Sequence, residues 1–249
     1  MNNPLDDERE LSLEEIHERL KELDRLKDSF VALVSHELRT PVNLISGFLD
    51  LGIEALDDED MDPEEYLKLA RKNTRRVVRV VQELTDFARL QRGQNVTHLA
   101  PISVEEALRQ VLELLKSNLQ EKSLDLKILL PEDIRRMKFD SESQIIILRN
   151  ILSNAAKFSP PEKPIIIEGE MTGQSVLLSV RDYAEPIPES KREMIFDDFR
   201  QVENYLTRRY EGMGLGLAVA RRTARFLGGD IKLKVLEDGN VFTVAFPAP

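Results

Sequence analysis

The sequence predicts an α+β protein in which a dimeric antiparallel helical hairpin, completed to a four-helix bundle by its copy, is followed by a two-layer α/β sandwich. Two long stretches with one apolar stripe each predict the hairpin, because such helices must bury their stripes against other helices. Strands paired through short turns and interleaved with helices predict the sandwich. We expect residues 1–96 to form a coiled-coil entry and the hairpin, and residues 97–249 to form the second domain.

The composition excludes several classes of protein. The 249 residues include 45 acidic and 35 basic side chains, for a net charge of −10. Such a balance argues against nonspecific nucleic-acid binding, which needs a basic surface. The absence of cysteine excludes disulfides and thiolate sites. No apolar run reaches the ~20 residues of a membrane helix, and no signal peptide is visible. We therefore expect a cytoplasmic chain, either alone or as the cytoplasmic part of a larger or membrane-bound protein.

The first predicted helix runs from Leu11 to about Ala55 and carries a 3-4 apolar repeat, which is typical of a coiled-coil or bundle seam. The seam positions are Leu13, Ile16, Leu20, Leu23, Lys27, Phe30, Val34, Glu37, Pro41, Leu44, Phe48, Leu51 and Ala55. A helix of about 45 residues would be ~68 Å long, too long for one small core. We therefore expect it to pair with a copy of itself.

The second helix of the hairpin should begin after an acidic turn. Asp62 is placed to cap it, with Pro63 at the first position and Glu65 completing a capping box. Gly93 is a plausible stop. A basic run on this helix is interpreted as a solvated face; it comprises Arg71, Lys72, Arg75, Arg76 and Arg79.

One imidazole in the first helix stands out because of its neighbours. His36 falls on the face opposite the seam, with Thr40 one turn further along. Pro41 lacks an N–H and should kink or loosen the helix nearby. The segment is not a zinc protease motif, because Thr40 stands where a second histidine is required. A lone exposed histidine is usually a plain surface residue, which is the interpretation given to His17 and His98.

The second domain alternates between helical and extended patterns. Helices are expected at 104–122, 141–158 and 215–227, and strands at 124–129, 164–170, 175–181, 231–236 and 241–246. Within the second of these helices, Asn150 and Asn154 lie one turn apart on one face, with Lys157 just beyond. Asparagine is a poor helix former, and amide oxygens suit Mg2+, so this face is a candidate cation or polar-ligand site. A plain polar helix face is the competing interpretation.

Three further islands in this domain could carry chemistry. Asp182 follows a strand and could accept a hydrogen bond from the exocyclic amine of a base. The segment 196–199 reads Phe-Asp-Asp-Phe, which by itself indicates only a small satellite cluster. The segment 212–217 has glycines at every second position before a helix. Glycines let a backbone approach phosphates, and the helix that follows offers free N–H groups. The spacing is not the dinucleotide fingerprint.

Taken together, these segments resemble the core of a sensor histidine kinase of two-component signalling. Residues 35–41, Ser-His-Glu-Leu-Arg-Thr-Pro, resemble the H box; residues 150–158 resemble the N box, 196–199 the F box and 212–217 the second Gly box. The resemblance extends from Leu11 to the C-terminus. It implies a dimeric helical hairpin followed by an ATP-binding sandwich of the kind shared with Hsp90 and type II topoisomerases.

By this resemblance, the chain uses ATP and Mg2+ to phosphorylate its own His36. Glu37 would hydrogen-bond the ring or accept its proton, and the phosphoryl group would pass to an aspartate on the receiver domain of a response regulator. Thr40 would orient the water that dephosphorylates the regulator, which makes the chain a regulator phosphatase as well. The partners implied are a second copy of the chain and the response regulator.

The resemblance also assigns the nucleotide site. Asp182 would take the adenine amine, Asn154 would hold Mg2+ with help from Asn150, and a lid at 200–211 would close over the ligand. The remaining contacts to the phosphates are assigned to Lys157, Arg208, Gly212, Gly214 and Gly216.

One departure from the family pattern keeps an alternative open, and the expected lid is also short. The family's first Gly box reads Asp-x-Gly-x-Gly-Ile, whereas Ala184 and Pro186 occupy the glycine positions here. This change favours weaker nucleotide binding, so the alternative is a nucleotide-weak signalling scaffold or a phosphatase-biased pseudokinase. An ATPase on the same fold would need a carboxylate on the asparagine helix to activate water. No carboxylate lies between Asn150 and Asn154, which argues against that function.

Overall fold

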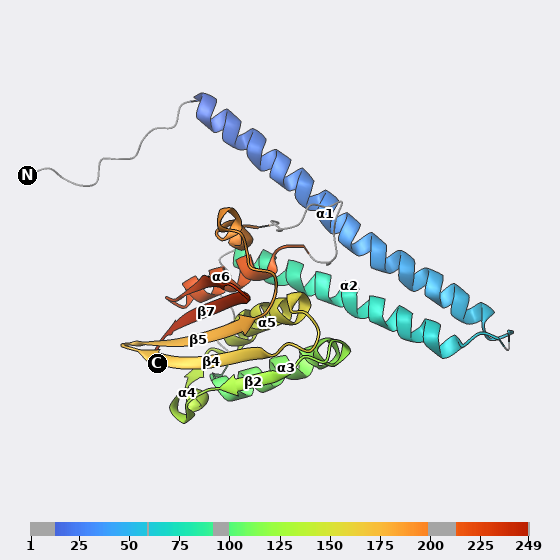
Figure 1. Ribbon diagram of the computed structural model, residues 1–249. Coiled ribbons are helices and arrows are strands. Elements are labelled where there is room, and N and C mark those ends of the chain that lie inside the picture. Colours follow the sequence, from blue (N-terminus) through green and yellow to red (C-terminus); the bar gives the residue numbers. More distant parts are fainter. Residues whose placement is uncertain (1–12, 59, 92–99, 199–212, 249) are drawn as a thin grey trace, which may run out of the picture. The chain divides into compact units, whose positions relative to one another are not determined.

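A computed structural model describes residues 13–58, 60–91, 100–198 and 213–248, which fold as two compact units (Figure 1). The first unit ends at Val77 and the second begins at Val78. Within the described residues, no helix combines the length and the apolar character that a membrane crossing requires.

Two long helices dominate the first part of the chain, as the apolar repeats predict. Helix α1 spans Leu13–Glu54 and helix α2 spans Pro63–Gln91. The expected cap of α2 is confirmed, because the Asp62 carboxylate accepts the N–H of Glu64 at 2.9 Å. Helix α1 continues without interruption through Pro41. The expected stop of α2 at Gly93 lies outside the described residues.

The seam residues of α1 divide into two groups. The side chains of Leu13, Ile16, Leu20, Leu23 and Lys27 lie outside the described part of the structure. Further along, Glu37 and Pro41 are buried within the single chain, whereas Leu44 remains 41% exposed. On α2, Leu67 is 54% exposed. Both helices of the hairpin therefore leave large apolar side chains exposed in the single chain.

The second unit contains a five-stranded sheet with the order β2-β4-β5-β7-β6. Its strands are β2 (Leu126–Leu129), β4 (Ile165–Thr172), β5 (Ser175–Asp182), β6 (Asp230–Leu236) and β7 (Gly239–Pro247). Strand β2 pairs with β4 in parallel, and the other neighbours are antiparallel. Two short strands, β1 (Ile102–Ser103) and β3 (Lys138–Phe139), pair separately.

Helices form the second layer of the sandwich, along one face of the sheet (Figure 1). They are α3 (Val104–Glu121), α4 (Glu132–Arg136), α5 (Ser141–Phe158) and α6 (Gly216–Phe226), with short 3-10 turns η1 (Glu189–Lys191) and η2 (Met194–Phe196). Helix α5 contacts β5, and α6 contacts β6 and β7. The two-layer α/β sandwich predicted from the sequence is thus confirmed.

The alternation of buried residues along β5 and β7 carries two polar groups into the interior. Val176, Leu178 and Val180 of β5 face the helices, and the next position in phase is Asp182 at the end of the strand. On β7, Asn240 is in phase with the buried Phe242. Register pairs Asp182 with Asn240, so the sheet ends in a buried polar pair.

Candidate functional site

The histidine identified from its motif is strongly exposed, and the acid that follows it is not. The His36 side chain is 71% exposed and that of Glu37 is 1% exposed. Adjacent residues on a helix point about 100° apart, so His36 faces outward while Glu37 occupies the seam. One oxygen of Glu37, Oε1, lies 3.9 Å from Nδ1 of His36, which is longer than a hydrogen bond. The imidazole is accessible to a reactant and has a carboxylate within reach.

The buried carboxylate also contacts helix α2. Nη2 of Arg76 lies 3.4 Å from Oε2 of Glu37, and the Arg76 side chain is only 15% exposed. The interpretation of the basic run as a solvated face is therefore wrong for Arg76. It holds for Arg71, Lys72, Arg75 and Arg79, whose side chains are exposed. Nothing in the heptad pattern distinguishes Arg76 from its neighbours, because the contact depends on the register of the hairpin.

Thr40 lies one turn beyond His36, and its hydroxyl has a partner in the helix. The Oγ1 atom donates to the carbonyl oxygen of His36 at 3.2 Å. Pro41 follows immediately and cannot donate a backbone hydrogen bond to the preceding turn. The Thr40 hydroxyl therefore bonds back to the preceding turn, a common arrangement of threonine in helices, and it stays close to the histidine backbone.

In the second unit, α5 brings its two asparagines close to the start of α6. Asn150 is buried, and its Nδ2 donates to the carbonyl oxygen of Ile146 at 2.8 Å. A Cβ placed on Gly216 would lie 2.9 Å from Oδ1 of Asn150, so glycine is required there by close packing. Asn154, one turn on, is only partly buried. It is the less buried of the two asparagines, and an amide oxygen suits a cation that also takes water and phosphate oxygens.

Asp182 lies in a network that fixes the loop after β5. Its Oδ1 accepts the N–H of Ala184 at 3.0 Å and the side-chain amide of Asn240 at 3.1 Å. Asn240 also donates to the carbonyl of Glu185 at 3.3 Å and accepts the N–H of Ile187 at 3.0 Å. Burial raises the pKa of Asp182 above its ordinary value, and the hydrogen bonds from Asn240 and Ala184 oppose this rise. A buried carboxylate with a fixed direction suits recognition of an amine.

The start of α6 combines a left-handed glycine with an open helix end. Gly214 has φ 71°, a conformation that favours glycine. Leu215 stands at the N-cap of α6, and its apolar side chain makes no capping hydrogen bond. By contrast, Ser103 caps α3 and Asp140 caps α5. Within the part of the chain that the structure describes, the N-cap residue of α6 therefore leaves the first N–H groups open to another acceptor, and such helix N-termini bind phosphate.

An acid that the sequence pattern did not single out lies near these groups. Glu83, in the part of α2 that belongs to the second unit, accepts the N–H of Met213. Burial raises its pKa, and the positive charge of Lys157 is the strongest opposing influence. In the same unit, the buried Asp86 is paired with Arg149 of α5. Two cations of α5, Arg149 and Lys157, are therefore associated with carboxylates of α2.

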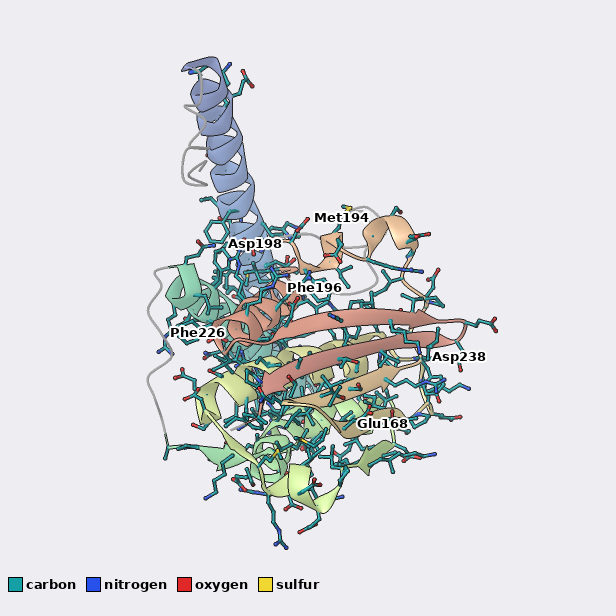
Figure 2. All side chains as sticks on the ribbon, turned by 90° about the vertical axis from the view of Figure 1, so that its left-hand side faces the viewer. Glu168, Met194, Phe196, Asp198, Phe226 and Asp238 are labelled. Carbon is teal, nitrogen blue, oxygen red and sulfur yellow. The ribbon has the colours of Figure 1, made fainter. Side chains whose placement is uncertain are left out.

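The described part of the Phe-Asp-Asp-Phe segment, residues 196–198, is integrated into the sandwich, whereas Phe199 lies outside the described residues. Phe196 packs in the core, and the guanidinium of Arg221 lies 4.5 Å from its ring centre. Asp198 accepts a hydrogen bond from Arg222 at 2.6 Å. Figure 2 shows Phe196 and Asp198 on the side of the sheet that carries α6. This segment therefore braces α6, whose N-terminus is part of the candidate site.

Several expected site residues fall outside the described residues: Arg208, Gly212 and the lid at 200–211. Within the described part, Asn150 packs closely against Gly216. Glu83 accepts the N–H of Met213 and is influenced by the positive charge of Lys157. The sequence analysis does not single out Asn240. A polar residue in phase with Phe242 and Val244 on a buried strand face is nevertheless a detectable signal.

The structure combines a helical hairpin that exposes a histidine with an α/β sandwich that buries the Asp182 carboxylate at the end of its sheet. This is the arrangement expected of a phospho-acceptor hairpin joined to a nucleotide-binding domain. Two family models agree with this class. Residues 26–93 match the His Kinase A (phospho-acceptor) domain. Residues 140–249 match the histidine kinase-, DNA gyrase B-, and HSP90-like ATPase. Together the two matches identify the chain as a two-component sensor histidine kinase core.

Similar proteins support this assignment. The chain is 31% identical over 243 residues to hybrid signal transduction histidine kinase D of Dictyostelium discoideum, covering 94% of this chain and 16% of that protein. A full-length structure of ShkA in complex with AMPPNP is 27% identical, with a TM-score of 0.60, covering 89% of this chain and 46% of that one. The structure of histidine kinase ThkA in complex with response regulator protein TrrA has a TM-score of 0.62 at 24% identity, covering 96% and 68%.

The chain spans only part of such proteins. It covers 16% to 43% of the lengths of three curated histidine kinases that it matches. The similarity therefore describes a core that in these relatives belongs to a longer protein.

Proposed function

We propose that this chain transfers the γ-phosphoryl group of ATP to His36 and then to an aspartate on the receiver domain of a response regulator. The observation that carries the proposal is the exposed imidazole of His36 with the Glu37 carboxylate 3.9 Å from Nδ1. An exposed imidazole can approach a phosphorus atom. A carboxylate at the opposite ring nitrogen stabilises the positive charge that develops there.

ATP binding is expected of the second unit, whose family model describes an ATPase-type domain. Asp182 would accept the adenine amine, and the amides at Gly214 and Gly216 would bind phosphate oxygens. Lys157 would neutralise phosphate charge, with Arg208 and Gly212 assigned by sequence alone. Asn154, with the buried Asn150 in support, would supply an amide oxygen to Mg2+, which bridges phosphate oxygens in phosphoryl transfer. The partly exposed side chain of Asn154 and the apolar N-cap residue of α6 support this arrangement.

The partners proposed are a second copy of the chain and a response regulator receiver domain. The exposed leucines of the hairpin, Leu44 and Leu67, support pairing between copies. The neighbour solved with a response regulator supports the second partner. We also propose that residues 1–96 act as the dimerisation and phosphotransfer part and residues 97–249 as the catalytic part; the two family matches fall on either side of this boundary.

The decisive experiment is incubation with γ-labelled ATP and Mg2+, followed by acid and alkali. A phosphoimidazole is lost in acid and survives alkali, so the label should show this stability in wild type and be absent from His36→Gln. Label that persists in His36→Gln would place the phosphoryl elsewhere. A wild-type chain that neither binds nucleotide at millimolar concentration nor takes label would favour a signalling scaffold.

Light scattering tests the dimer independently of chemistry. At micromolar concentration we expect twice the chain mass for wild type, and dissociation or unfolding for Leu44→Asp, which buries an unpaired charge. A wild-type monomer would contradict the proposed pairing.

A further inference from the structure

The buried carboxylate of Glu37 has two neighbours from two helices. Its Oε1 faces Nδ1 of His36 at 3.9 Å, and its Oε2 faces Nη2 of Arg76 at 3.4 Å. Burying a carboxylate is costly unless a cation or hydrogen-bond donors compensate it. Arg76 supplies a cation from the other helix of the hairpin, 39 residues away.

The arginine is distinguished from the cations around it by burial. Its side chain is 15% exposed, whereas Arg75, its neighbour in sequence, is exposed. A solvated arginine would not fix the direction of either Glu37 oxygen. An arginine held between two helices fixes one oxygen and so limits where the other oxygen can lie.

We propose that Arg76 is a positioning residue for the phosphoryl-accepting histidine. By holding Oε2 of Glu37, it keeps Oε1 directed at the Nδ1 side of His36. This favours the tautomer in which Nδ1 carries the proton and Nε2 carries the free electron pair. The inference rests on the proposed phosphorylation of His36 and names a residue outside the H box that prepares it.

The transfer can be balanced with these groups. The Nε2 electron pair forms the N–P bond while the bond from the γ-phosphorus to its bridging oxygen breaks, and that electron pair leaves on ADP. The ring becomes positively charged, and Oε1 of Glu37 stabilises the Nδ1–H or takes its proton, which then passes to water. The gap of 3.9 Å has to shorten for this contact, as catalytic hydrogen bonds often do when the substrate arrives.

Four proteins test the role: wild type, Arg76→Ala, Arg76→Lys and the control Arg75→Ala. The initial rate of His36 phosphorylation at saturating ATP should fall about 10- to 100-fold in Arg76→Ala. The KM for ATP should stay within about twofold, because Arg76 acts through Glu37. Arg76→Lys should recover part of the rate, and Arg75→Ala should match wild type. An Arg76→Ala rate equal to wild type, or an equal loss in Arg75→Ala, overturns the inference.

A nitrogen spectrum reports the role without any need for ATP. With 15N-labelled histidine at alkaline pH, the His36 signal, assigned by its loss in His36→Gln, should show the Nδ1–H tautomer enriched in wild type. In Arg76→Ala it should shift toward the Nε2–H form. An unchanged tautomer overturns the inference even if wild type is an active kinase. If wild type takes no label, the proposed function fails, but the spectrum still tests the role of Arg76. Failure of the proposed function and failure of the inference can therefore be told apart.

A double variant without either charge covers the case in which Arg76→Ala does not fold. The pair Glu37→Gln, Arg76→Gln removes both charges and avoids an isolated buried ion. If Arg76 acts only through Glu37, this double variant should phosphorylate at the rate of Glu37→Gln alone. A double variant clearly slower than Glu37→Gln would show that Arg76 acts by another route and would overturn the inference.

Discussion

The side-chain amide of Asn240 donates to Oδ1 of Asp182 at 3.1 Å across two neighbouring strands. The same asparagine accepts the N–H of Ile187 at 3.0 Å, so it joins the candidate adenine reader to the loop that follows. Gly239, just before it, lies so close that a Cβ there would come 2.1 Å from the carbonyl oxygen of Asp182. Hydrogen bonding and close packing at the end of the β5–β7 pair therefore fix the position of Asp182.

Asn240→Ala should weaken nucleotide binding without unfolding the sheet. Asp182 and the loop lose hydrogen bonds worth ~1 kcal/mol each, so the Kd for a nonhydrolysable ATP analogue should rise roughly five- to thirty-fold. Calorimetric titration measures this. Thr243→Val is the matched control, because its Oγ1 pairs with Ser179 at 2.8 Å on the same two strands, away from the loop. Equal weakening in both variants would assign the effect to the sheet and not to the site.

Gly216→Ala should destabilise the second unit and weaken ATP-analogue binding. The added Cβ would meet Oδ1 of Asn150 at 2.9 Å, and that side chain is tied to Ile146. Overpacking of this kind costs ~1–3 kcal/mol. Chemical denaturation measures the cost, with Gly47→Ala of α1 as control, since nothing lies within 4 Å of its Cβ position. A Gly216→Ala protein as stable as wild type would show that Asn150 moves aside freely.

The stability of the second unit should depend on Asp230 in acid. Burial would raise its pKa, but hydrogen bonds from Arg221 and Arg225 outweigh this and lower the pKa from 3.8 to about 2. Because the folded pKa is depressed, the stabilisation is present above the unfolded value and is lost as the pH falls through the folded value. This contribution of Asp230 to the free energy of unfolding is on the order of 1–2 kcal/mol after allowance for solvent screening.

The measurement is urea unfolding between pH 5 and pH 2 for wild type and Asp230→Asn. Wild type should lose more free energy of unfolding over this range than the variant, since the variant has no charge to lose at this position. Parallel curves for the two proteins would mean that the ion pairs with Arg221 and Arg225 contribute nothing.

Thr40→Ala should spare phosphorylation of His36 and slow dephosphorylation of the regulator, by about tenfold or more. Thr40 shares the face of His36 without being the nucleophile, and its hydroxyl lies 3.2 Å from the His36 carbonyl. The assay uses the receiver domain that takes label fastest from phospho-His36, and Thr40→Ser is the control that keeps the hydroxyl. An equal loss of both activities would make the hydroxyl a structural support ahead of Pro41.

Most long elements could be predicted because their signals are local. Helix α5 begins and ends where the pattern places it, between the Asp140 cap and the Ser-Pro-Pro stop. The short strands β1 and β3 have two residues each, too few for an alternation to be visible. The short helix α4 was missed as well.

The contacts that were missed join residues far apart in sequence. Arg76 meets Glu37 only because α1 and α2 fold back in a particular register. Asn240 meets Asp182 because β7 returns beside β5, 58 residues later. The motif residues could be named from their boxes, whereas the groups that hold them in place follow from tertiary pairing.

Ala184 and Pro186 stand where the family's first Gly box has glycines. Ala184 is buried, and its N–H donates to Asp182 at 3.0 Å, so the turn forms without glycine. Ala adds a Cβ, and Pro186 removes a donor and fixes φ near −65°. The loop should therefore be stiffer and less able to close over a base, while Asp182 and Asn240 keep their geometry.

The double variant Ala184→Gly, Pro186→Gly should bind an ATP analogue more tightly than wild type. One or two recovered hydrogen bonds at ~1 kcal/mol each correspond to roughly five- to thirty-fold in Kd. Added glycines also loosen the free loop, which costs ordering entropy on binding and places the gain toward the lower end of that range. Calorimetry compares wild type, the double variant and Asn240→Ala combined with it. If the glycines do not tighten binding, the loop is not what limits affinity; if they tighten it only when Asn240 is intact, the loop acts through the network around Asp182.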